Sequence, residues 1–131
     1  MTIAPSEALP PIVVSAEDYA TLSALADSYA QSMPDVTDYL VRELDRAAVV
    51  APDAVPAGVA TMHSTVRFRD DVTRKERTVT LVYPGEQDIA EGRISVMTPI
   101  GVALIGLRKD QSIAWETRRG EAKGLTILDV T

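Results

Sequence analysis

Two aspartates, Asp35 and Asp38, are the side chains of this sequence best placed for metal chemistry. They lie three residues apart in the stretch MPDVTD, at the start of an expected helix, so they share one helix face. Two carboxylates can bind Mg²⁺ while waters and a substrate fill the other positions. The alternative is that both are helix-start carboxylates, which the positive end of the helix dipole stabilises.

Other polar side chains give no catalytic pattern. His63 is the single histidine and there is no cysteine, so neither a zinc set nor a catalytic triad can be assembled, and we assign His63 no role. A nucleophile elbow, a P-loop and a dinucleotide-binding motif are also absent from the sequence. We therefore predict a protein without enzymatic activity, with no catalytic residues, no metal ligands and no cofactor.

The charge is acidic and unevenly distributed. Residues 1–53 carry nine Asp and Glu against two Arg, whereas residues 54–131 carry ten against eleven Lys and Arg. Direct binding to a nucleic-acid backbone needs a clustered positive field, which this distribution does not provide. A short basic cluster is interrupted by carboxylates and is typical of a solvated hairpin: Arg67, Arg69, Asp70, Asp71, Arg74, Lys75, Glu76 and Arg77. The acidic first part permits a protein partner with a basic surface, or serves solubility alone.

No segment predicts contact with a membrane. No apolar run approaches the length of a membrane span. The N-terminus, MTIAPSEALPP, lacks the basic and apolar regions of a secretory signal. We expect a cytoplasmic protein.

The first part of the chain predicts a helical hairpin. Residues 1–10 are polar and without periodicity, as in a disordered tail, and Pro11–Val14 can form a short strand. A helix is expected over Ala16–Ser32, capped by Ser15, and a second helix from Asp35 or Val36 to Ala48. Their apolar stripes and the short turn between them predict an antiparallel pair, a short coiled coil, within residues 11–52. Pro52 and Pro56 mark a linker.

The second part, residues 53–131, predicts a sheet domain with one short helix. Val66 and Phe68 alternate with charged residues, and turns recur between short apolar runs, which is typical of an antiparallel sheet. The further strands are expected at Arg77–Tyr83, Ile94–Met97, Ser112–Thr117 and Leu125–Val130, with a turn over Arg118–Gly124. The helix Pro99–Ile105 is the available cover for one face of this sheet, so the fold class is α+β.

A strand passes directly into a capped helix in the stretch GRISVMTPIGVALIGL, residues 92–107. Thr98 is a good N-cap, and Pro99 suits the first helical position because its missing N–H has no partner there in any helix. Gly106 suits the left-handed residue that closes a helix. Capping alone accounts for Thr98 and Pro99.

This stretch, together with TLVYPGEQD (residues 80–88), a strand with Ile113 and Trp115, and the final strand, resembles the C-terminal domain of the GreA/GreB transcript-cleavage factors. The resemblance implies an FKBP-like sheet with one short helix. The first third is instead similar to the nucleoside diphosphate kinase regulators, a related family, through ELDRA (residues 43–47), the proline-spaced linker and TMHSTVRFRD (residues 61–70). Trp115 is expected in the core or along the FKBP-like concavity, without prolyl isomerase activity.

The resemblance implies a partner, RNA polymerase, bound at the coiled coil on the rim of its secondary channel. In this family the corner that corresponds to Met97, Thr98, Pro99 and Ile100 helps to dock on that coiled coil. DNA would be contacted only indirectly, through the polymerase. The expected function is regulation by occupying the site of Gre-type factors without stimulating cleavage.

Two alternatives remain open at this point. Cleavage factors hold a catalytic Mg²⁺ with acidic residues at the hairpin tip, a role that would fall to Asp35 and Asp38. Their tip motif differs from MPDVTD, and a 17-residue helix reaches only about 25 Å, so we expect this tip to stop short of the polymerase active centre. The other alternative is direct regulation of nucleoside diphosphate kinase.

Overall fold

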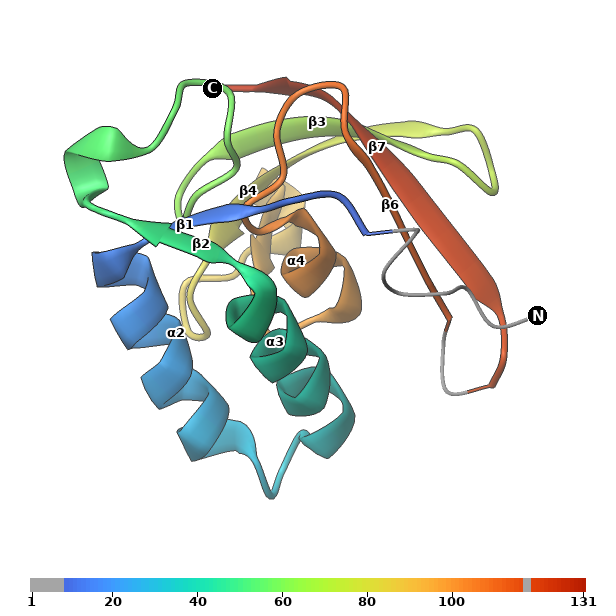
Figure 1. The fold of residues 1–131 in the computed structure, drawn as a ribbon. Helices are drawn as coiled ribbons and strands as arrows, with labels where there is room; N and C mark the ends of the chain where they lie inside the picture. Colours follow the sequence, from blue (N-terminus) through green and yellow to red (C-terminus); the bar gives the residue numbers. More distant parts are fainter. Residues whose placement is uncertain (1–8, 117–118) are drawn as a thin grey trace.

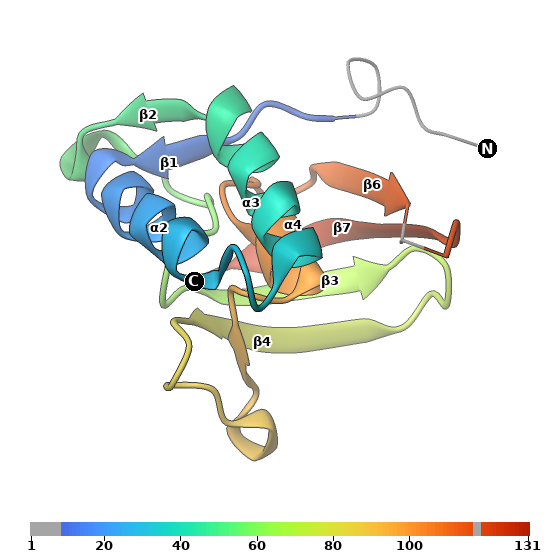
Figure 2. The same cartoon turned by 90° about the horizontal axis from the view of Figure 1, so that it is seen from below.

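The computed structural model describes residues 9–116 and 119–131, and Figure 1 shows its elements. Residues 1–8 of the expected tail, Thr117 of the expected strand Ser112–Thr117 and Arg118 of the expected turn lie outside them. The helices α2, α3 and α4 lie on one side of the main sheet (Figures 1 and 2), which confirms the α+β class. In chain order the elements are β1 (Val13–Ser15), α2 (Ala16–Tyr29), α3 (Pro34–Arg46), β2 (Ala48–Val50), η1 (Pro52–Ala54), β3 (Thr65–Asp70), β4 (Glu76–Val82), η2 (Ile89–Glu91), β5 (Arg93–Ser95), α4 (Pro99–Leu104), β6 (Ser112–Glu116) and β7 (Ala122–Val130).

The helical hairpin begins as the sequence predicts. The Ser15 hydroxyl accepts a hydrogen bond from the Asp18 amide at 3.0 Å, which caps α2. The helix ends at Tyr29 and not at Ser32, because the chain reverses direction over residues 30–33. Met33 leaves helical geometry, with φ −136°, as expected of a residue before proline.

The end of the hairpin differs from the prediction. We expected the second helix to continue to Ala48 and a linker to follow, but α3 ends at Arg46 and residues Ala48–Val50 form β2. This strand pairs in parallel with β1, from Val13 opposite Ala48 to Ser15 opposite Val50. The prediction was wrong because β2 is specified by a distant partner: the exposed edge of β1 offers hydrogen bonds that a longer helix would forgo.

The main sheet has the strand order β5-β4-β3-β7-β6. The pairs β3–β4, β3–β7 and β6–β7 are antiparallel, as predicted. The pair β4–β5 is parallel, with Thr80 opposite Arg93 and Val82 opposite Ser95. The expectation of an antiparallel sheet is therefore wrong at this edge, and the sheet is mixed, because the chain after β4 loops back through η2 before β5 begins.

The hairpin and the sheet share one hydrophobic core. Leu22 and Leu40 of the hairpin belong to the same buried cluster as Phe68 of the sheet and Val102 of α4. Segment 11–13 also crosses Gly106, where the Val13 amide donates to the Gly106 carbonyl at 3.2 Å. The hairpin is thus packed on the sheet domain and is not a separate projecting arm. Among the described residues, no helix has the length and apolar character needed to cross a membrane.

Candidate functional site

The corner between β5 and α4 is held by hydrogen bonds around Thr98. Its hydroxyl accepts from the Gly101 amide at 3.0 Å and donates to the Ser95 carbonyl at 2.8 Å. The Ser95 hydroxyl in turn accepts from the Met97 amide at 3.0 Å. The predicted N-cap at Thr98 is therefore confirmed, and its hydroxyl fixes both sides of the corner.

Gly101 allows α4 to approach the end of β5. A Cβ atom at this position would lie 2.5 Å from the Ser95 carbonyl oxygen and 2.7 Å from the Val96 Cα. Both neighbours are backbone atoms that no side-chain rotation can move away. The glycine in the sequence TPIG is thus required by packing, and the corner is rigid.

The four residues proposed for the corner differ in accessibility. Pro99 is exposed, and Thr98 and Ile100 are half-buried. Met97 is only 2% exposed and belongs to the core cluster. A partner that binds this corner without rearranging it therefore contacts Pro99 and Ile100, whereas Met97 is part of the hydrophobic core.

Thr98, Pro99 and Ile100 form one side of an open groove of about 420 Å³. Most of its lining is apolar, and charged side chains lie among the rest. The lining residues are Phe68, Asp70, Arg77, Ile94, Thr98, Pro99, Ile100, Trp115, Lys123, Gly124 and Leu125. A concave, mostly apolar lining with a few charged groups is typical of a binding site.

The charged residues of the groove have defined settings. The Arg77 guanidinium lies 5.8 Å from the centre of the Phe68 ring, a cation–π distance. The backbone amides of Thr73, chiefly, and Val72 donate to Asp70 and hold the pKa of this carboxyl below its ordinary value. Two cations, Arg77 and Lys123, thus line the groove together with one carboxylate.

The sequence predicted that Phe68 and Trp115 lie on alternating strands, but it did not predict that both line one groove with Pro99. Trp115, expected in the core or along a concavity, packs against the core and also lines the groove. Its ring centre lies 6.4 Å from that of Tyr39 on α3. The alternation of apolar residues was the available signal for Phe68; the strand order that joins these elements was not readable.

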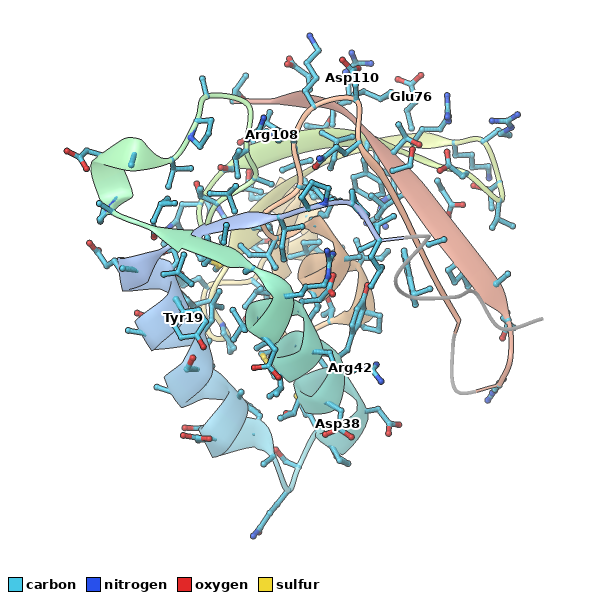
Figure 3. The ribbon with its side chains drawn as sticks, viewed as in Figure 1. Tyr19, Asp38, Arg42, Glu76, Arg108 and Asp110 are labelled. Atoms are coloured by element: carbon cyan, nitrogen blue, oxygen red, sulfur yellow. The ribbon has the colours of Figure 1, made fainter. Side chains whose placement is uncertain are left out.

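Asp35 and Asp38 lie elsewhere. Both are exposed on α3, Asp35 in its first turn, and Figure 3 shows Asp38 at the end of this helix away from the sheet. Neither lines the groove. Within residues 9–116 and 119–131, no group of three or more His, Cys, Asp or Glu side chains is arranged to hold a metal ion.

His63 has a local structural setting that the sequence did not indicate. Its backbone is left-handed, with φ +69°. Its Nε2 atom lies 3.0 Å from Glu86 Oε1, and its ring packs edge-on against Tyr83 at 5.6 Å between centres. This contact joins the turn before β3 to the loop after β4.

Comparison with known proteins gives the family. Residues 55–131 match the family described as "Transcription elongation factor, GreA/GreB, C-term", and residues 10–50 match the "Rnk N-terminus". The chain belongs to the GreA/GreB family. Within it, the chain is 37% identical over 92% of its length to the "Regulator of nucleoside diphosphate kinase" of Escherichia coli K12, of which it covers 89%. The predicted resemblance to both groups is confirmed.

Solved and curated relatives agree with this assignment. The "Prokaryotic transcription elongation factor GreA/GreB from Nitrosomonas europaea" is 39% identical with a TM-score of 0.72, and the match covers 94% of this chain and 99% of that one. "Transcription elongation factor GreA" of Chloroflexus aurantiacus is 42% identical, over 66% of this chain and 55% of its own length. The chain thus shares the fold of the Nitrosomonas europaea protein and spans about half of the longer Chloroflexus elongation factor.

Proposed function

We propose that this protein is a non-enzymatic transcription regulator that binds RNA polymerase at the rim of the secondary channel. The tip of the polymerase coiled coil would fill the groove, with Pro99 and Ile100 as its contacts on one side. Family membership supports the partner, and the position of the exposed Pro99 on an apolar groove is the observation that carries the proposal. Because bacterial polymerase works in the cytoplasm, the protein would act there.

The packing of the hairpin supports competition without cleavage. The 14 residues of α2 span only about 21 Å at 1.5 Å per residue. The hairpin also shares the core of the sheet domain, so it cannot swing out without exposing apolar side chains. A bound molecule would therefore block the site of a Gre-type factor, with an effect set by its concentration relative to Kd.

Competition binding tests this proposal. A labelled GreA-type factor is bound to core RNA polymerase, and this protein is titrated into the complex. We expect displacement by the wild-type chain and displacement weakened about 10-fold by Pro99→Ala or Ile100→Ser, since truncating a contact that matters for binding costs more than about 1 kcal/mol. The full chain is needed, because removing residues 9–54 would uncover the core around Gly106. Absence of both binding and displacement at micromolar concentration would reject the proposal.

A cleavage-stimulating role for Asp35 and Asp38 is tested separately. Stalled elongation complexes are incubated with the protein, and the length of the transcript is followed. We expect intact transcripts and the same result with Asp38→Asn. Short 3′ fragments that disappear with Asp38→Asn would establish the catalytic alternative instead.

The second candidate function is direct contact with nucleoside diphosphate kinase. The name of the Escherichia coli relative, "Regulator of nucleoside diphosphate kinase", favours it. Co-purification of the two proteins without polymerase is the decisive measurement. A stable complex would support direct contact, and separate elution would leave the polymerase as the point of action.

A further inference from the structure

The loop between β4 and β5, residues 84–92, holds an isoleucine in solvent. Ile89, on the η2 turn, is 87% exposed, the highest value among the large exposed hydrophobic residues that the structure describes. A single exposed apolar side chain is ordinary on a protein surface. Here, however, hydrogen bonds order the loop around Ile89, so its exposure is not that of a residue on an unrestrained loop.

Side chains within the loop provide part of this order. The Gln87 Oε1 atom accepts from the Gly85 amide at 2.6 Å, and Asp88 Oδ1 accepts from the Glu91 amide at 3.3 Å. Asp88 and Arg93 exchange two backbone hydrogen bonds, at 3.0 and 2.8 Å. Gly92 closes the η2 turn in the left-handed region. The turn that carries Ile89 is therefore shaped without any help from the isoleucine side chain.

The base of the loop is anchored to the body of the protein through Glu86. Its Oε1 atom accepts from the Tyr83 amide at 3.0 Å and lies 3.0 Å from His63 Nε2. These contacts give His63, whose backbone is left-handed, a structural role that the sequence did not indicate. The loop is thus oriented by two elements, the end of β4 and the turn before β3.

The loop stands beside the groove. The Thr80 amide donates to the Gly92 carbonyl at 2.8 Å, which joins the end of the loop to β4. The same strand supplies Arg77 to the groove, and β5, which follows the loop directly, supplies Ile94. Figure 2 shows η2 extending beyond β4 at this edge of the sheet. A large partner seated in the groove would extend over this edge and meet the loop.

The chemistry around Ile89 indicates what kind of surface fits it. Glu86, Asp88 and Glu91 are all exposed on the same loop, so the loop that carries the apolar tip also carries three exposed carboxylates. An apolar depression bordered by Lys or Arg side chains complements both features. Burial of the isoleucine side chain in such a depression would remove apolar surface from water, which favours binding.

We propose that the β4–β5 loop is a second docking element for RNA polymerase, which inserts Ile89 into an apolar, basic-bordered depression beside the segment that fills the groove. The proposal rests on the polymerase-binding function proposed above and extends it from one contact to two. The β4–β5 loop and the α4 corner would then both contact the partner, and Arg77 and Ile94 would line the groove between these two contacts.

Quantitative binding of the full-length chain to core RNA polymerase tests the proposal. The set comprises the wild type, Ile89→Ser, Ile89→Leu, Pro99→Ala and, as a matched control, Val49→Ser. Val49 is exposed on β2, which contributes nothing to the groove. We expect Ile89→Ser to raise Kd about 10-fold, Ile89→Leu to keep wild-type affinity, and Val49→Ser to have no effect. Thermal unfolding of Ile89→Ser should match the wild type, since the side chain is solvated.

Photo-crosslinking gives an independent readout. A photoreactive amino acid at position 89 is expected to crosslink to a polymerase subunit, and the same amino acid at position 49 is not. Light scattering of the free protein completes the set, because a dimer that Ile89→Ser dissociates would show that the loop joins two copies of this chain, which overturns the proposal.

The two proposals fail in different ways. If the wild-type chain does not bind polymerase, the proposed function is rejected and the loop contact with it. If the wild type binds and Pro99→Ala weakens binding while Ile89→Ser does not, the groove contact stands and the loop contact alone is overturned.

Discussion

The buried carboxylate of Glu43 forms an ion pair with Arg46, one helical turn further along α3. The guanidinium Nε and Nη2 atoms lie 2.6 and 2.9 Å from the two carboxylate oxygens of Glu43, whose side chain is 2% exposed. The remaining nitrogen, Nη1, donates to the Pro10 carbonyl. The pair therefore ties α3 to the segment that enters β1, and it gives the ELDRA stretch a structural role.

Loss of Arg46 should destabilise the fold strongly. Arg46→Ala leaves a buried carboxylate without a counterion, which costs about 3–5 kcal/mol. Arg42→Ala is the matched control: Arg42 is exposed and lies over the Tyr39 ring at 5.9 Å, a contact of about 1 kcal/mol or less. Urea unfolding of both variants checks the difference, and equal midpoints would contradict the role of the pair.

Gly101→Ala should lower stability and weaken polymerase binding together. The added Cβ meets the backbone of Ser95 and Val96, and such overpacking costs about 1–3 kcal/mol. Gly124→Ala is the control for stability only, because Gly124 also lines the groove; the atom nearest to its added Cβ lies 3.5 Å away, an ordinary contact. Thermal unfolding should separate the two variants, and similar unfolding of both would argue against a rigid corner.

Thr98 should tolerate serine and not valine. Serine retains the hydroxyl that accepts from Gly101 and donates to Ser95. Valine removes it and costs about 1 kcal/mol, as for other N-cap losses. Thermal unfolding of Thr98→Val against Thr98→Ser measures the cap, and the polymerase Kd of both variants measures its effect on the groove.

The features predicted correctly from the sequence are those that a few neighbouring residues determine. The caps at Ser15 and Thr98 were predictable because one side chain and the next three residues decide them. The β2 strand and the parallel β4–β5 pair were not, since each depends on a distant partner. Met97 was included in the docking corner through the family resemblance, and residue spacing gave no sign that the turn from β5 into α4 buries both Val96 and Met97. The groove could not be predicted either, because its lining residues come together only through the strand order of the sheet, which residue spacing does not reveal.

Tyr39→Phe should leave stability unchanged or raise it. The Tyr39 hydroxyl is buried and has no hydrogen-bond partner among the described residues, and burial raises the pKa of Tyr39 far above its ordinary value. Removing an unsatisfied buried hydroxyl recovers up to about 1 kcal/mol. Urea unfolding checks this, with Tyr19→Phe as the control at a partly buried tyrosine of α2; a large loss in Tyr39→Phe would reveal a partner for the hydroxyl.

Acid should remove the anchor of the β4–β5 loop. The hydrogen bond from His63, first, and that from the Tyr83 amide hold the pKa of Glu86 below its ordinary value of 4.5. A lowered carboxyl pKa stabilises the fold above pH 4.5, and this contribution is lost as the pH falls through the lower, folded-state value. The stability difference between wild type and Glu86→Ala should therefore shrink on acidification, and a constant difference from pH 7 to pH 3 would contradict the anchor.

The parallel β1–β2 ladder sets the two ends of the helical hairpin at a fixed separation, whatever lies between them. The hairpin turn, residues 30–33, is distant from this ladder, so a few helical turns added there would lengthen both helices without disturbing the ladder or the groove. Reach and docking are therefore separable properties in this architecture. Selection could adjust how far such a protein extends into a partner while its grip on the partner's surface stays the same.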